Sequence, residues 1–166
     1  MLLAVVIALA APAGALTVTG DLPSSGSLSI AELGGMAPVS VEWTDHGGDV
    51  RHFRAVPLDR VLARFGFTSG PMGKDVPILD KRAGWKKAVV AVAADGFEAV
   101  FSCAEVQDGM GPTRAYIAFE ADGKPLSAQE GPLRLLVPTD KERSRSVRQL
   151  VRLEIVDLRK RAREKH

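Results

Sequence analysis

Cysteine is almost missing from this sequence, which has one, Cys103, in 166 residues. A single thiol can form no internal disulfide, so the chain is not one of the small secreted scaffolds that disulfides hold together, and it has to fold by packing alone. The three histidines form no pair at a zinc-binding spacing. Nucleophile-elbow, phosphate-loop and dinucleotide-binding glycine motifs are missing as well. The sequence therefore assigns no catalytic residue and no metal site.

An excess of charge of one sign is missing too, because 22 Lys and Arg face 20 Asp and Glu and the net charge is +2. Nucleic-acid-binding domains carry a basic stripe on a matching fold, and neither is found here, so we expect no nucleic-acid partner. The hydrophobic fraction of 46% and the charged fraction of 25% are typical of a globular protein. The length suits one domain.

The first 15 residues, MLLAVVIALAAPAGA, are uncharged and mostly apolar. This run is shorter than the roughly 20 residues that a membrane-spanning helix needs. It ends in Ala13-Gly14-Ala15, which has the small-x-small form of a signal-peptidase site. We therefore predict a signal peptide over residues 1–15 with cleavage after Ala15, and a periplasmic or secreted protein; an uncleaved anchor is the alternative.

The remaining pattern predicts an α+β domain over residues 16–158, a β-rich mixed sheet with a few short helices, followed by a basic tail over residues 159–166. Strands alternate apolar and polar residues, and Asp-Gly pairs mark tight turns. Helices are predicted where a capping residue or proline precedes apolar residues at helical spacing. Strands are expected near 16–20, 39–44, 50–56, 87–93, 97–102, 115–121, 132–137 and 147–157, and short helices near 29–33, 57–65 and 102–105.

Cys103 lies in the third expected helix, where Ser102 and Glu105 have the spacing of a capping box. The simplest interpretation is a small apolar residue at the start of that helix. A metal ligand or a reactive thiol is the alternative, because a helix N-terminus lowers a thiol pKa.

The most polar stretch between two apolar runs is residues 140–146, DKERSRS, which contains three cations and two hydroxyls. Guanidinium and hydroxyl donors of this kind suit phosphate or carboxylate. The alternative is a solvated edge strand, whose charges prevent pairing with other sheets. Arg51, His52 and Arg54, from a predicted hairpin, are expected to converge on the same face. The candidate anion-binding residues are Arg143, Ser144, Arg145, Ser146, Arg148 and Arg51.

Several motifs in this order, PVSVEW, ADGKPL, GPLRLLVP and SVRQLVRLEI, resemble the oxidoreductase molybdopterin-binding domain of the sulfite oxidase superfamily. The resemblance runs from Thr17 to about Asp157 and indicates a small, stand-alone, exported member. It implies a sulfite oxidase-like α+β fold and, in catalytic members, molybdenum bound through the dithiolene of a pterin cofactor. It also implies that the segment SRSVRQL lies against the pterin and its phosphate end.

The same resemblance implies a cysteine ligand to molybdenum in the loop after PVSVEW, but residues 43–48 read WTDHGG. Cys103 follows a different strand and does not match that position. We therefore expect a binding domain for an anionic small molecule, a pterin or a protein partner. The alternatives are a periplasmic molybdenum-dependent oxidoreductase with an unusual ligand set, drawn from Asp45, His46 or Cys103 and paired with a periplasmic or membrane redox subunit, and a purely structural domain that docks through its basic C-terminal end.

Overall fold

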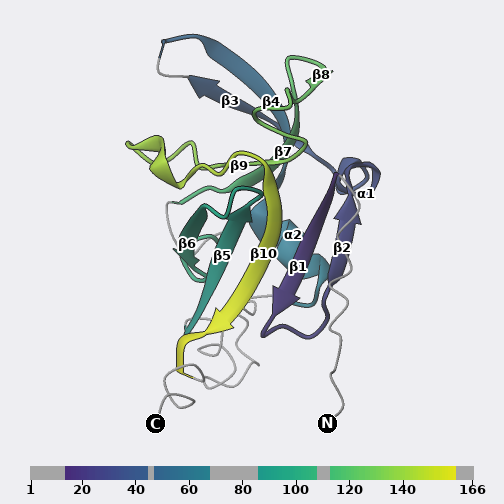
Figure 1. Ribbon diagram of the computed structural model, residues 1–166, viewed down its shortest axis with the longest axis vertical. Coiled ribbons are helices and arrows are strands. Elements are labelled where there is room, and N and C mark those ends of the chain that lie inside the picture. Colours follow the sequence, from purple (N-terminus) through teal and green to yellow (C-terminus); the bar gives the residue numbers. More distant parts are fainter. Residues whose placement is uncertain (1–13, 45–46, 68–85, 108–112, 160–166) are drawn as a thin grey trace, which may run out of the picture.

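The computed structural model describes residues 14–44, 47–67, 86–107 and 113–159, which form two β-sheets with two short α-helices (Figure 1). The expected α+β, sheet-dominated fold is thereby confirmed. Most of the predicted signal peptide, the candidate ligands Asp45 and His46, and residues 160–166 of the expected tail lie outside the described residues.

The first sheet is mixed and has the strand order β2-β1-β10-β5-β6. Its centre is β10, which runs parallel to β1 and antiparallel to β5. The hairpin β5–β6 turns at the Asp95-Gly96 pair that the sequence indicated. The strands are β1 (Ala15–Gly20), β2 (Gly26–Ser29), β5 (Lys87–Ala93), β6 (Glu98–Ser102) and β10 (Leu150–Asp157).

The second sheet is antiparallel, with the order β3-β4-β7-β8 and β9 paired to β7. The β3–β4 hairpin projects from the body of the molecule, and the loop between β9 and β10 runs below it (Figure 1). The strands are β3 (Val39–Thr44), β4 (Val50–Pro57), β7 (Tyr116–Ala121), β8 (Lys124–Pro125) and β9 (Arg134–Leu136).

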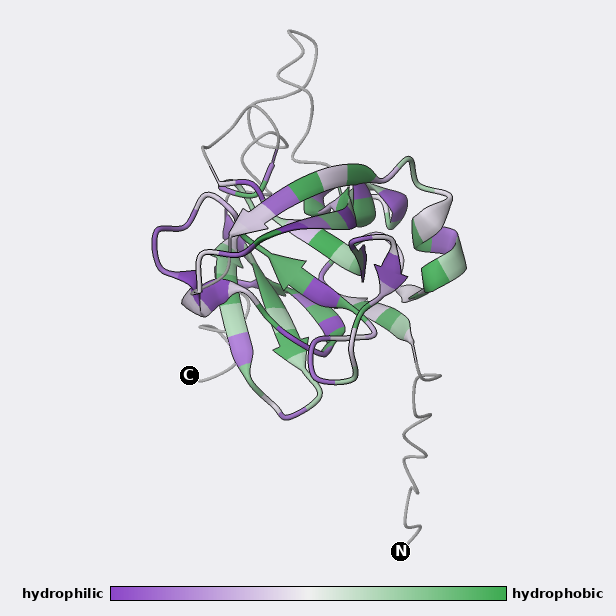
Figure 2. Ribbon diagram, turned by 90° about the horizontal axis from the view of Figure 1, so that it is seen from above, coloured by the Kyte–Doolittle hydropathy of each residue, from purple (hydrophilic) through white to green (hydrophobic). Residues whose placement is uncertain are grey.

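The main core lies between the inner face of the first sheet and α2 (Leu58–Arg64), and the strands are rich in hydrophobic residues (Figure 2). Alternate strand residues such as Leu153 and Ile155 are almost completely buried, as period two predicts. A second, smaller apolar cluster belongs to the other sheet and includes Trp43, Phe53 and Leu136. Trp43 of this smaller cluster also lines the site described below.

Two of the three predicted helices form. The helix α1 (Ile30–Gly34) begins with the expected capping box, in which the Glu32 N–H donates to Ser29 Oγ at 3.2 Å and the Ser29 N–H donates to Glu32 Oε2 at 2.8 Å. In α2, Pro57 is the N-cap residue and not the first helical residue. No helix among the described residues is long and apolar enough to cross a membrane.

The third predicted helix, after Ser102, is wrong, because residues 103–106 form turns. Ser102 Oγ accepts from the Ala104 N–H at 3.3 Å, and the Glu105 carboxylate accepts from Arg145 instead of closing a capping box. The additional helical turn is a 3₁₀ turn at Arg143–Arg145.

The alternative that the basic segment is an edge strand is also wrong. Residues 146–149 are not in a strand, and β10, which follows them, is paired on both sides. A central strand needs no charges to prevent edge pairing. The cations before β10 therefore call for another explanation.

Candidate anion-binding site

A cavity of about 280 Å³ opens between the β3–β4 hairpin, β9 and the loop that precedes β10. Strand pairing in the second sheet places residues from β3, β4 and β9 on one side of it, and the 3₁₀ turn supplies the other side. We call it the arginine cavity. Its lining residues are Trp43, Arg51, Glu130, Arg134, Arg143, Ser144, Ser146 and Arg148.

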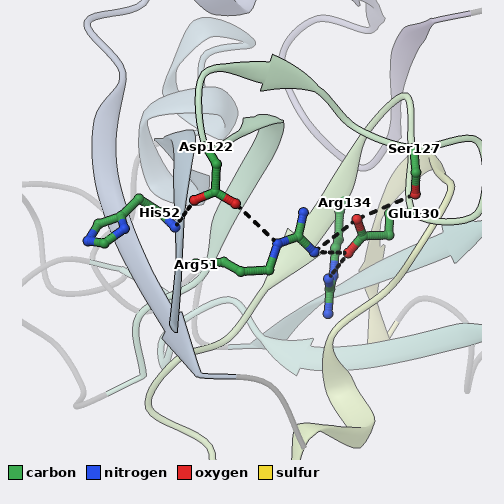
Figure 3. Close-up of polar contacts among 6 residues, drawn as sticks. All are labelled: Arg51, His52, Asp122, Ser127, Glu130 and Arg134. Atoms are coloured by element: carbon green, nitrogen blue, oxygen red, sulfur yellow. Dashed lines mark hydrogen bonds and ion pairs between the residues drawn. The ribbon is translucent and has the colours of Figure 1, made fainter. Parts of the chain in front are cut away.

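One wall of the arginine cavity is an ion-pair network centred on Glu130 (Figure 3). Arg51 Nη1 donates to both carboxylate oxygens of Glu130, at 2.9 and 3.0 Å, and Arg134 Nη1 donates to Oε1 at 2.6 Å. Arg51 Nε also donates to Asp122 Oδ2 at 3.4 Å. Burial alone would raise the pKa of Glu130, but the hydrogen bond from Arg51 and the neighbouring guanidinium charges lower it overall. Glu130 is therefore ionised and fixes two arginine side chains in place.

At the arginine cavity two buried guanidinium N–H groups, Arg134 Nε and Arg143 Nη1, have no hydrogen-bond acceptor among the residues that the structure describes. Both guanidinium carbons lie 5.2 Å from the centroid of the Trp43 ring, which holds them against an apolar surface. Burying a donor without an acceptor costs about 1–3 kcal/mol, and more for a charged group. Such groups in a folded protein point to an acceptor that binds there, such as a water, an ion or a ligand.

The charges around the arginine cavity do not balance, since four arginines face the single carboxylate of Glu130. Among the described residues, Arg143 and Arg148 form no ion pair. Burial, as the largest effect, lowers the pKa of Arg134, and the charge of Arg148 acts in the same direction. An anion in the arginine cavity would relieve this repulsion and accept from the unpaired donors.

The structure brings together five of the six residues that the sequence singled out. Their role in binding stays a prediction, but they share one cavity although they come from two distant segments. The five are Arg51, Arg143, Ser144, Ser146 and Arg148.

The sixth, Arg145, does not line the cavity. Its guanidinium donates to both oxygens of Asp140 at 2.7 and 2.6 Å and to Glu105 at 2.9 Å, and it lies 4.8 Å from the Phe101 ring centroid. The hydrogen bond to Asp140 is the largest cause that raises the pKa of Arg145. Arg145 therefore anchors the loop to the main core.

His52 and Arg54 do not converge with Arg51. Successive residues of β4 point to opposite faces, so the side chains of His52 and Arg51 point apart (Figure 3). His52 Nε2 lies 4.0 Å from Glu42, and Arg54 Nη1 lies 3.3 Å from Glu120. Both contacts lie at the surface, outside the arginine cavity.

Sequence reasoning missed Glu130 and Arg134 and gave Trp43 no place in the site. Trp43 belongs both to the smaller apolar cluster and to the cavity lining, since only 4% of it is exposed and it lines the cavity. Arg134 had a usable signal, because it is the lone charge in the apolar stretch GPLRLLVP and a buried charge needs a partner. Nothing local marks Glu130 as that partner.

The described residues do not fit a thiolate-ligated molybdenum. Cys103 is fully buried in the main core and does not line the arginine cavity. Burial raises the pKa of its thiol to about 12, so it stays protonated at neutral pH. In the described ranges no three His, Cys, Asp or Glu side chains cluster as metal ligands would. The unpaired guanidinium donors do fit the anionic end of a pterin cofactor.

We predict that native protein at pH 8 does not react with a thiol reagent such as 5,5′-dithiobis(2-nitrobenzoate) over minutes, because the Cys103 thiol is buried and protonated. The same reagent should label one thiol per chain in 6 M guanidinium chloride, as an internal control. Rapid labelling of the native state would contradict the assigned environment of Cys103.

Comparisons with known proteins agree with this fold. The sulfane dehydrogenase SoxCD from Paracoccus pantotrophus is a structural neighbour with a TM-score of 0.58 and 19% sequence identity, over 86% of this chain and 38% of that one. The chain thus spans well under half the length of that neighbour. A search of the curated proteins gives no match. The family model described as "Oxidoreductase molybdopterin binding domain" matches residues 15–163. This chain therefore belongs to the oxidoreductase molybdopterin-binding domain family.

Proposed function

We propose that this chain is a binding domain of its family that holds an anionic ligand in the arginine cavity and does not ligate molybdenum through a cysteine. The observation that carries the proposal is a pair of buried donors, Arg134 Nε and Arg143 Nη1, that find no acceptor within the described part of the chain. The unbalanced charge of the lining supports it. Charge-assisted hydrogen bonds to an oxyanion are roughly twice as strong as neutral ones, so an oxyanion would use these donors well.

The ligand class that suits the lining is an oxyanion such as phosphate, free or as the phosphate end of a pterin. The guanidinium groups of Arg143 and Arg148 would supply charge, and the hydroxyls of Ser144 and Ser146 adjustable donors. A bound pterin cofactor would supply redox chemistry at its dithiolene. The contribution of this chain is to bind and orient the anionic end against Trp43.

Two further parts of the proposal concern location and partners. The apolar segment 1–15 supports export to the periplasm or the outside of the cell. A periplasmic or membrane redox subunit is the proposed kind of protein partner, because SoxCD, the structural neighbour, is itself a dehydrogenase. A separate redox subunit is compatible with the finding that this chain matches only part of that neighbour's length.

The second candidate is a molybdenum-dependent oxidoreductase with an unusual ligand set. Membership of the family favours it. Asp45 and His46 occupy the loop where the family resemblance places the metal ligand, and they lie outside the described residues. Metal content separates the two candidates.

The test is elemental analysis, with oxidative release of pterin, on protein purified from the periplasm of a host that makes the cofactor. A parallel titration with inorganic phosphate follows Trp43 fluorescence in a Trp85→Phe background. We expect no molybdenum, and a phosphate affinity that weakens with added salt. Stoichiometric molybdenum would support the oxidoreductase instead. Failure to bind both pterin and phosphate would overturn the proposed function.

A further inference from the structure

A second surface, separate from the arginine cavity, lies at the edge of β6, the last strand of the first sheet, which among the described residues pairs with β5 alone (Figure 1). The Cys103 N–H donates to the Lys87 carbonyl at 3.0 Å, and the Ala93 N–H donates to the Phe97 carbonyl at 2.9 Å. These two bonds lie at the two ends of the β5–β6 ladder. Opposite pairs in an antiparallel ladder alternate between hydrogen-bonded and non-hydrogen-bonded, so the two bonds determine which β6 residues direct their backbone groups toward β5. The residues that direct their backbone N–H and C=O groups away from β5 are Glu98, Val100 and Ser102.

This edge lacks the features that prevent strands from pairing between molecules. Protected edges carry lysine, proline, bulges or inward charges, or are very short. The edge strand β8 has three of these protections, a lysine, a proline and a length of two residues, because it consists of Lys124–Pro125 alone. In β6 the single charge is Glu98, at the start of the strand, and the centre is Val100.

Two large apolar side chains at this edge are exposed. Val100, at the centre of the strand, is 56% exposed and Phe97, just before the strand, is 47% exposed, both high values for large apolar residues. Val100 lies opposite the partly exposed Val90 of β5 on the outer face of the sheet. An edge with exposed apolar side chains and unpaired backbone groups is a template for another strand.

We infer that β6 pairs antiparallel with β6 of a second copy of this chain, about a two-fold axis at Val100, and so joins the two five-stranded sheets into one. A register centred on Val100 is the one that pairs all three outward-facing residues of each strand. It places Val100 against Val100 and Glu98 against Ser102 of the second copy. No two carboxylates oppose each other, so the strand is complementary to itself in shape and charge.

The interface is small, because a strand of five residues provides most of it. Stable interfaces bury about 1,200–2,000 Å² in total, so we expect a weak, reversible dimer with a dissociation constant on the order of 10 μM or above. The Ser102 carbonyl also accepts from the Glu105 N–H at 3.1 Å, which weakens one end of the new ladder.

The test is sedimentation velocity on the full chain from about 5 to 500 μM, a range that spans the expected dissociation constant. We compare the native chain with Val100→Lys, which would place two cations opposite each other at the axis, and with Val50→Lys as the matched control. Val50 is 51% exposed but lies in the β3–β4 hairpin. We expect the native chain and the Val50→Lys variant to dimerise with increasing concentration, and Val100→Lys to remain monomeric.

A second variant, Val100→Pro, tests the same position in case Val100→Lys does not fold. In Val100→Pro the lost N–H faces the open edge and not β5, so the strand should keep its ladder while pairing is blocked. Circular dichroism and thermal unfolding check that both Val100 variants fold. A native chain that stays monomeric at 500 μM, or folded Val100 variants that dimerise as the native chain does, would overturn the inference. Amide exchange of Val100 that slows with protein concentration would support it independently.

Discussion

Replacing Arg143 by alanine is expected to weaken phosphate binding by about tenfold or more while changing the free energy of unfolding by less than about 1 kcal/mol. A hydrogen bond to a charged group contributes about 1.5–3 kcal/mol, and 1.4 kcal/mol corresponds to a factor of ten in affinity. The Arg143 Nη1 donor has no acceptor among the described residues, so its removal breaks no hydrogen bond within the described part of the fold. What is lost is its packing against Trp43, about 0.5–1 kcal/mol, and relief of repulsion from the other arginines partly offsets that loss.

The matched control is Arg145→Ala, two residues along the same charged run. Arg145 has three short hydrogen bonds to Asp140 and Glu105 and lies outside the arginine cavity. Its side chain is 34% exposed, so after solvent screening we expect a loss of stability of about 1–2 kcal/mol. Phosphate affinity should change little. Phosphate titrations and urea unfolding of both variants test this expectation. Equal losses of phosphate affinity in the two variants would mean that the arginine cavity is not the site.

This pair of arginines also marks the limit of prediction from sequence. Arg143 and Arg145 have the same residue type and share Ser144 as a neighbour in one polar run, and the sequence placed both in one site. Only the 3₁₀ turn, which the sequence did not predict, sends one side chain toward Trp43 and the other toward Asp140. Short-range spacing carries no information on this choice.

Local signals did predict most elements of the fold. The capping box at Ser29 and the turn at Asp95-Gly96 depend on residues within a few positions of each other, and both form as expected. The same type of capping signal failed at Ser102, because the Glu105 carboxylate has a stronger partner in Arg145, 40 residues away. The tertiary ion pair was therefore stronger than the local preference for a capping box.

The wall of the arginine cavity was not predictable for the same reason. Arg51 and Glu130 are 79 residues apart in the chain and meet only in the folded protein, where the loop between β8 and β9 brings Glu130 to the side chain from β4. The family resemblance pointed to the segment before β10 but not to this carboxylate. Glu130 is nevertheless the residue on which the geometry of two cavity arginines depends.

Replacing Glu130 by glutamine is therefore expected to lower the free energy of unfolding at pH 7 by about 2–4 kcal/mol, which corresponds to a drop in Tm of roughly 4–16 °C. The side chains of Glu130 and Arg134 are only 13% and 8% exposed, and removing one charge of a buried pair leaves the other uncompensated. Glutamine can still accept one hydrogen bond, so the loss should lie below that of full removal. The control is Glu120→Gln, whose partner Arg54 is about half exposed and whose loss should cost less than about 1 kcal/mol.

The difference in the free energy of unfolding between the native chain and Glu130→Gln should also depend on pH, and it should become smaller as the pH falls. The folded-state pKa of Glu130 lies below its ordinary value of 4.5, so the unfolded chain binds this proton first as the pH falls. Its stabilising effect is complete above about pH 5.5 and is lost as the pH drops through 4.5 and then through the folded-state pKa. Urea unfolding at pH 8, 6, 5 and 4 should give the same difference in the free energy of unfolding at pH 8 and pH 6, and a smaller difference at pH 4. A difference that stays constant to pH 4 would mean that the Glu130 carboxylate does not carry the stabilisation, and that its partners in the wall are held by packing instead.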